Sequence, residues 1–151
     1  MEISVFRDNE LITGISVLAV LRYTKKLELS KCMLIEPLLS YSQVVKLLKR
    51  SNSSIKSIED LILKESIIFS NFNTRYYEKL LLSINSLRLF EEMALLRIES
   101  DGVVYTGDAF DFSEKSLGQR AIDRISASKK LAEILTKGEA SDFYLSLRIE
   151  L

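Results

Sequence analysis

The sequence predicts a mainly α-helical fold, a single helical domain with one β-hairpin that resembles the wing of a winged-helix protein. Apolar residues make up 47% and charged residues 28% of the 151 positions, which is typical of a globular chain with its own core. The segment RIESDGVVYTG (97–107) alternates strand-forming residues around Asp101-Gly102, a strong two-residue turn signal. Apolar residues recur at helical spacing over three long stretches, 9–26, 74–94 and 116–136.

The first predicted helix runs from Asn9 to about Lys26, with Asp8 or Asn9 as its cap. Valines broaden its apolar stripe, so we expect this helix to be covered on more than one side. The uninterrupted apolar run ITGISVLAVL spans ten residues before Arg22, too short to cross a bilayer. We expect no signal peptide, because the N-terminus has neither a basic leading region nor a small-residue cleavage site.

One proline and several serines divide the segment that follows. Pro37 disfavours helix at Glu36, which predicts a kink or break there. Ser40 and Gln43 form a capping-box pattern for the next helix. The polar stretch SNSSIKS (51–57) predicts a linker, and with it a subdivision in which 58–151 contains the helix, wing and helix. Ser57 can cap the helix that begins after it.

The second half of the chain predicts a long helix, the hairpin, another long helix and a short C-terminal element. The helix over 74–94 has little polar face, which suggests a central position or a shared surface. Ser116 and Gln119 form a capping box for the helix over 116–136. The end of the chain is expected to begin as a short helix and finish extended. On the stripes of three helices, the predicted core residues are Leu18, Leu81, Leu87 and Ile125.

The residue types argue against an enzyme. The chain has no histidine, and its single cysteine, Cys32, lies among apolar residues, which is typical of a structural thiol in a reducing, cytoplasmic setting. The glycines form no phosphate-binding loop. Asp101, Asp108, Asp111 and nearby Glu99 match no metal-binding spacing, and Asp101 is already explained by the turn. We therefore expect no catalytic residue, no cofactor and no metal site.

A DNA-binding function is the alternative. Lys plus Arg equals Asp plus Glu at 21 each, so no overall field attracts nucleic acid. The predicted wing is acidic, with Arg97 facing several carboxylates, and should repel a phosphate backbone. Basic residues gather near the linker and on the late helix, where the simplest interpretation is a solvated face. The weak nucleic-acid candidates on that helix are Arg120, Arg124 and Lys130.

A protein-contact function fits more of the chain. Aromatic residues and arginine, the types enriched at interface hot spots, cluster in FNTRYYEKL. The alternative is that Phe72 and Tyr76 pack into the core and anchor the helix there. The apolar C-terminus either packs internally or adds to a partner's sheet. The partner-interface candidates are Phe72, Arg75, Tyr76, Tyr77, Glu99, Asp101, Tyr144 and Arg148.

Over most of its length the sequence resembles the middle component of ABC three-component systems, the small subunit that accompanies an SMC-like ATPase and an effector in Lamassu-type bacterial defence. The resemblance rests on the first long helix, on LIEPLL around Pro37, on 72–98 with the acidic wing, and on 126–151. It is poorest in KRSNSSIKS, around the predicted linker.

This resemblance implies a non-catalytic adaptor that bridges the SMC-like ATPase and a nuclease-type effector in an anti-phage or anti-plasmid complex. It supplies no catalytic residues. DNA would be reached only indirectly, through the complex, and no membrane is involved. The alternative is a winged-helix transcriptional regulator, which would require the wing or the helix before it to be basic.

Overall fold

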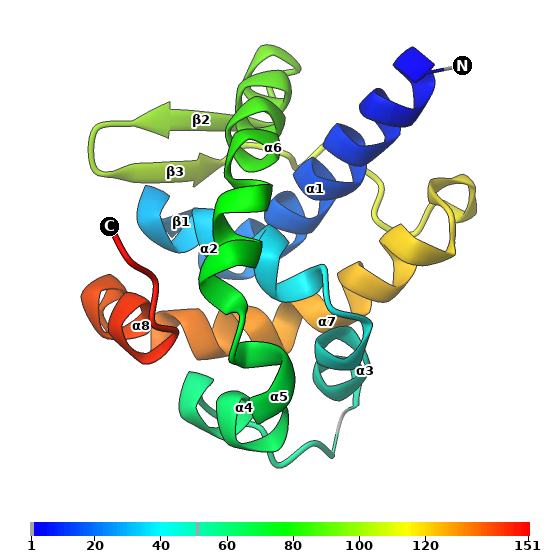
Figure 1. Ribbon diagram of the computed structural model, residues 1–151. Coiled ribbons are helices and arrows are strands. Elements are labelled where there is room, and N and C mark those ends of the chain that lie inside the picture. The colour runs from blue at the N-terminus through cyan, green and yellow to red at the C-terminus, as the bar shows by residue number, and fades with distance from the viewer. Residues whose placement is uncertain (1, 51) are drawn as a thin grey trace.

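The computed structural model describes residues 2–50 and 52–151, with side chains for 9–50 and 52–151. Helices dominate it, with one small antiparallel sheet (Figure 1), which confirms the predicted mainly α fold with a hairpin. The elements in chain order are α1 (Glu2–Thr24), β1 (Lys26–Leu27), α2 (Leu29–Leu39), α3 (Ser42–Lys49), α4 (Ile58–Lys64), α5 (Ser66–Phe69), α6 (Phe72–Glu92), β2 (Leu96–Glu99), β3 (Gly102–Tyr105), the 3₁₀ helix η1 (Lys115–Leu117), α7 (Gln119–Thr136) and α8 (Ala140–Ser146).

Helix α1 is the central element. Every residue from Thr13 to Leu21 is buried, as predicted for a helix covered on more than one side. Figure 1 shows α1 crossing the middle of the molecule, and its main packing partners are α7 and α6. Gly14 allows the close approach of α6, because a Cβ at this position would clash with the Phe90 ring. Within the described residues, no helix is long and apolar enough to cross a membrane.

Helix α2 is buried along almost its whole length, and of the kink or break predicted at Glu36, the break is wrong. The helix continues through Pro37 and ends at Leu39. Pro37 lies in the last turn, where the missing N–H costs a single backbone bond. Glu36 is held in place by tertiary contacts, described below, which outweigh the local preference of a residue before proline.

The predicted helix starts had mixed outcomes. Ser57 caps α4 as expected, with the Asp60 amide donating to its hydroxyl at 3.1 Å. The two predicted capping boxes, Ser40 with Gln43 and Ser116 with Gln119, are wrong. The Ser40 hydroxyl donates back to the Pro37 carbonyl, and α3 begins at Ser42 without a side-chain cap. Ser116 lies in η1, and Gly118 with a positive φ of 92° precedes α7.

The sheet has the strand order β1-β3-β2, and its third strand, β1, was not predicted. In the hairpin, Glu99 pairs with Gly102, so the turn residues are Ser100 and Asp101 rather than the predicted Asp101-Gly102. Gly102 has another role. A Cβ there would lie 3.0 Å from the backbone oxygen of Leu27, so a glycine lets β1 approach β3.

Helix α6 buries a face that its apolar pattern does not indicate. Ser83 and Ser86 are fully buried, whereas Leu81 is 68% exposed, so the prediction that Leu81 belongs to the core is wrong. A serine hydroxyl can bond its own helix one turn back, as Ser86 does to the Leu82 carbonyl. This bond satisfies the Ser86 hydroxyl, whereas the buried Ser83 hydroxyl has no hydrogen-bond partner among the described residues. Of the other predicted core residues, Leu18 and Leu87 are buried and Ile125 is half-buried.

The C-terminal segment folds back onto the start of α6 instead of ending as an extended strand. After α8, Arg148 adopts a positive φ of 58° and the Ile149 amide returns to the Tyr144 carbonyl at 3.0 Å. Leu147 and Ile149 are buried, and the Glu150 amide donates to Asn73. Of the two predicted alternatives, the chain end adopts internal packing.

The core contains buried side chains from both sides of the 51–57 segment. Leu48 from α3 and Leu61 from α4 belong to the same hydrophobic cluster. Ile55, inside the polar segment itself, is 3% exposed and also belongs to it. Helix α4 in turn packs against α8.

Candidate functional site

The aromatic cluster at the start of α6 belongs mainly to the core. Phe72 is fully buried and packs against Phe69, with their ring centroids 5.5 Å apart, and against Tyr41. Tyr76 is 5% exposed and stacks edge-on against Tyr144 at 5.5 Å. Phe72 and Tyr76 are therefore not surface contacts for a partner, because their rings anchor α6 to the rest of the fold.

Two other interface candidates are also engaged within the chain. The guanidinium of Arg75 lies 4.4 Å from the Tyr41 ring centroid and donates to Ser40. The Tyr144 hydroxyl donates its one hydrogen to the Ser30 carbonyl at 2.7 Å. In its contact with the Tyr76 hydroxyl, Tyr144 is therefore the acceptor and Tyr76 the donor. Burial raises the pKa of Tyr144 above its usual value, which keeps the phenol protonated. These contacts stabilise the fold, while Arg148 remains exposed.

The predicted acidic wing is largely neutralised by its own neighbours. Arg97 bonds Glu99 at 2.6 Å, and Lys26 bonds Asp101 at 2.7 Å. Lys26 comes from β1, the strand that sequence reasoning missed, and it lies 3.9 Å from Glu99 as well. Two cations and two carboxylates balance, so the hairpin carries no net negative charge once Lys26 of β1 is counted with it. Among the described residues, the loop beyond the hairpin has acidic side chains that form no ion pair, such as exposed Asp108.

An apolar stripe follows the uncovered face of α6. Tyr77, Leu81 and Ile84 are 45%, 68% and 40% exposed, and their spacing of four and three residues places them on one side of the helix. We call these three residues the α6 stripe. At its N-terminal end, the Tyr77 hydroxyl donates to the Glu150 carbonyl.

The α6 stripe lies beside further exposed apolar surface. A shallow hollow of about 490 Å³ opens between α2, α6 and α8, and Leu29 and Leu151 line it. These two leucines are 48% and 96% exposed. The stripe and hollow give this side of the molecule its apolar character.

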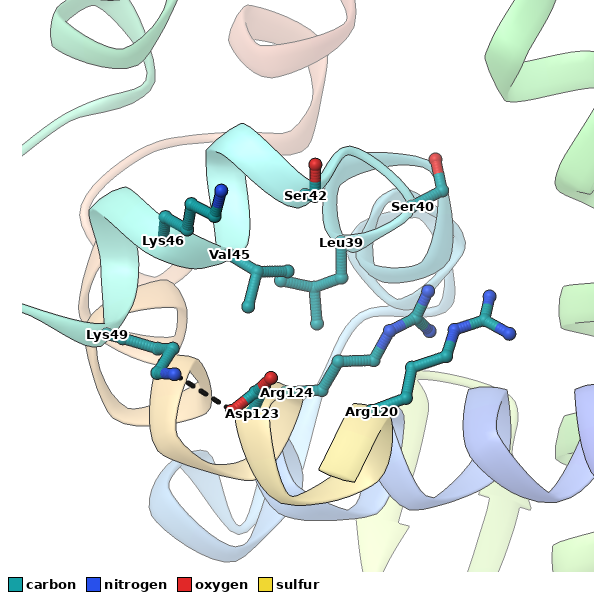
Figure 2. Close-up of a pocket in the computed structure, with 9 residues that line it drawn as sticks. All are labelled: Leu39, Ser40, Ser42, Val45, Lys46, Lys49, Arg120, Asp123 and Arg124. Carbon is teal, nitrogen blue, oxygen red and sulfur yellow. Dashed lines mark hydrogen bonds and ion pairs between the residues drawn. The ribbon is translucent and has the colours of Figure 1, made fainter. Parts of the chain in front are cut away.

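The two basic segments noted in the sequence meet in space. Helix α3 packs along α7, and a groove of two adjacent hollows, about 210 and 250 Å³, follows their junction. In Figure 2, Lys46 and Lys49 extend from α3 on one side of the first hollow, and Arg120 extends from α7 on the opposite side, next to Arg124. We call this feature the α3–α7 groove. Its cationic side chains other than Arg124 are Lys46, Lys49, Arg50, Arg120, Lys129 and Lys130.

Arg124 lines the groove, but its guanidinium is not accessible to a ligand bound there. Its side chain is 3% exposed and donates from Nη1 to Glu36 Oε1 at 2.6 Å and from Nη2 to Oε2 at 3.3 Å. Thr13 and Ser16 of α1 complete this buried network. The expectation that Arg124 shares an accessible basic face with Arg120 is therefore wrong, because its guanidinium is buried and bonds Glu36 on α2 and Ser16 on α1.

Cys32 is buried, and burial raises the pKa of its thiol to about 12, which disfavours the nucleophilic thiolate. Among residues 9–50 and 52–151, no group of three or more side chains is placed to hold a metal ion.

Comparisons of the chain with protein-family models, with curated proteins and with solved structures gave no match. Beyond the resemblance of the sequence, functional inference therefore depends on the surfaces themselves. Two of them stand out, the apolar α6 stripe and the cationic α3–α7 groove.

Proposed function

We propose that the protein is a non-catalytic adaptor subunit that works in the cytoplasm and joins an SMC-like ATPase to an effector protein in a bacterial defence complex. The α6 stripe carries this proposal. Exposed leucine, isoleucine and tyrosine on one helix face are typical of a surface that a partner covers. The family resemblance of the sequence supplies the identity of the partners.

The spacing of the stripe suits a helical partner. Residues at i, i+4 and i+7 form a ridge that packs into the groove of a facing helix. An SMC-like ATPase offers long helices in its coiled coil, and the α6 stripe would lie against one of them. The balanced charge of the chain is compatible with a subunit that is covered by partners rather than kept apart by repulsion.

The alternative, a winged-helix regulator, is less well supported by the surface of α6. This helix precedes the wing and would be the one to enter the major groove. Its exposed charged residues are Arg88 and three carboxylates, Glu78, Glu91 and Glu92. Phosphate contacts need the opposite sign. The exposed face of α6 therefore favours protein over DNA.

Co-purification with the proteins encoded beside this one tests the proposal. We expect a stable complex with the SMC-like ATPase, and the Leu81→Ser/Ile84→Ser variant should weaken it by about 2 kcal/mol or more, roughly thirtyfold in affinity. A matched control is Leu63→Ser/Ile67→Ser on α4 and α5, because these residues are 80% and 87% exposed yet lie outside the stripe.

Both double variants should melt close to wild type, since exposed substitutions usually change stability by no more than about 0.5 kcal/mol. Equal binding by the stripe variant and wild type would contradict the α6 interface. A chain that forms no complex and instead footprints one operator sequence at physiological salt would contradict the adaptor itself.

A further inference from the structure

We propose that the α3–α7 groove is a binding surface for the phosphate backbone of duplex DNA, recognised by charge and without sequence preference. This goes beyond the adaptor function, because it gives the subunit a direct DNA contact of its own. It also differs from the expectation that DNA is reached only through partners.

The first support is the segregation of charge. Apart from buried Arg124, the groove has six cationic side chains and two carboxylates, which leaves a net charge of +4. The cations are Lys46, Lys49, Arg50, Arg120, Lys129 and Lys130, and the carboxylates are Asp123 and Glu133. The whole chain has a net charge of zero, so this excess is concentrated on one surface. A local field of this sign attracts polyanions even when the molecule as a whole is neutral.

The second support is that most of these cations form no ion pair with another described residue. Asp123 pairs with Lys49 at 2.8 Å, and Gln119 donates to the same carboxylate oxygen. Within the described residues, the other five cations of the groove form no ion pair. In contrast, Lys26 and Arg97 on the strands of the sheet are both paired with carboxylates of the hairpin. Most cations of the groove thus remain unpaired, whereas these two do not.

The third support is the shape of the surface. The beginning of α3 faces the beginning of α7, and the end of α3 faces the middle of α7, so the cations lie in two neighbouring rows. Arg120 and Lys130 are ten residues apart, or about 15 Å along the helix axis. One strand of duplex DNA presents about four phosphates over that length.

Polar groups in the first hollow add to this complementarity. Figure 2 shows the Ser42 hydroxyl above the space into which Leu39 and Val45 project, with Arg120 at its lower edge. Both α3 and α7 begin without a side-chain cap and without an acidic residue in the first turn. Their positive dipole ends therefore reinforce the cations, and hydroxyl groups are common donors to phosphate.

Fluorescence anisotropy with the isolated full chain and two labelled 20-base-pair duplexes of unrelated sequence tests the proposal. We expect equal affinities for the two duplexes. With about four phosphate contacts, the slope of log K against log salt should be about −3.6, so affinity should fall roughly 150-fold between 50 and 200 mM salt.

The Lys46→Gln/Arg120→Gln variant removes two groove cations and leaves the Lys49–Asp123 pair intact. Its slope should fall to about −1.8, with at least a tenfold loss of affinity at low salt. The control Lys64→Gln/Arg88→Gln removes the same charge from exposed positions on α4 and α6 and should bind like wild type. Unchanged melting of both variants by circular dichroism excludes unfolding as the cause.

Three results would overturn the proposal: no DNA binding at 50 mM salt, equal losses in the groove and control variants, or a groove that binds labelled poly-glutamate without competition from DNA. The last would assign the groove to an acidic protein surface. The DNA-binding assay needs no partner, so a negative result would not contradict the α6 interface. A negative result in the co-purification test would likewise not contradict DNA binding by the groove.

Discussion

The buried Arg124–Glu36 pair makes the sharpest test of how this fold is held together. Arg124 on α7 and Glu36 on α2 are 3% and 1% exposed, and their shortest contact is 2.6 Å. Thr13 donates to the same carboxylate at 2.7 Å, and Ser16 accepts from Arg124 at 3.3 Å. One ion pair and two hydroxyls of α1 thus connect three helices at the centre of the molecule.

Replacing Arg124 with Met keeps most of the side-chain volume but leaves Glu36 buried without a counter-charge. Breaking one side of a buried pair typically costs about 3–5 kcal/mol, a large part of the roughly 5–15 kcal/mol that stabilises a domain. For a chain of this length, that corresponds to a fall in melting temperature of about 6–20 °C. The matched control is Arg120→Met, one turn away and exposed, which should change stability by no more than about 0.5 kcal/mol.

The double variant Arg124→Met/Glu36→Leu removes both charges and separates the ion pair from simple packing. We expect it to recover most of the lost stability, because a well-packed apolar pair can replace a buried salt bridge at little cost. Thermal and urea unfolding followed by circular dichroism give the double-mutant cycle. If Arg124→Met costs no more than Arg120→Met, or if the single effects simply add, the pair does not hold the three helices as described.

Three further outcomes follow from other contacts. Gly14→Ala should cost about 1–3 kcal/mol in urea unfolding, because its Cβ would overlap the Phe90 ring, and a wild-type midpoint would argue against close packing of α1 on α6. Cys32 should resist alkylation in the native protein at neutral pH and react once urea unfolds the chain, since burial raises its pKa to about 12; rapid labelling without urea would contradict this. The hydrogen bond and charge of Lys26 hold the pKa of Asp101 below its usual value, so this pair stabilises the fold above the unfolded pKa of about 4 and loses that effect as pH falls through the folded pKa. Lys26→Met should raise the pKa of Asp101 in a carboxyl NMR titration, and an unchanged value would show that Lys26 does not cause the shift.

The sequence by itself determined the features that depend on local periodicity and turn chemistry. The long helices, the hairpin, the buried first helix and the Ser57 cap all followed from short-range patterns, because helical spacing and capping involve residues within a few positions of one another. The apolar surroundings of Cys32 likewise indicated a buried thiol. Even there, the pattern fixed the presence of an element better than its first residue, as the two incorrect capping boxes show.

Only the tertiary structure decided which side of each helix faces the core and which distant charges meet. On α6, the apolar pattern placed Leu81 inside, but Ser83 and Ser86 are the buried residues of this helix, which packs against α1 and α2. Glu36 and Arg124 are 88 residues apart, so nothing local could reveal that each buries the other. The same holds for the α3–α7 groove and for Lys26 beside the hairpin: the energy of a charge depends on its neighbours in space, and those neighbours exist only once the helices have packed.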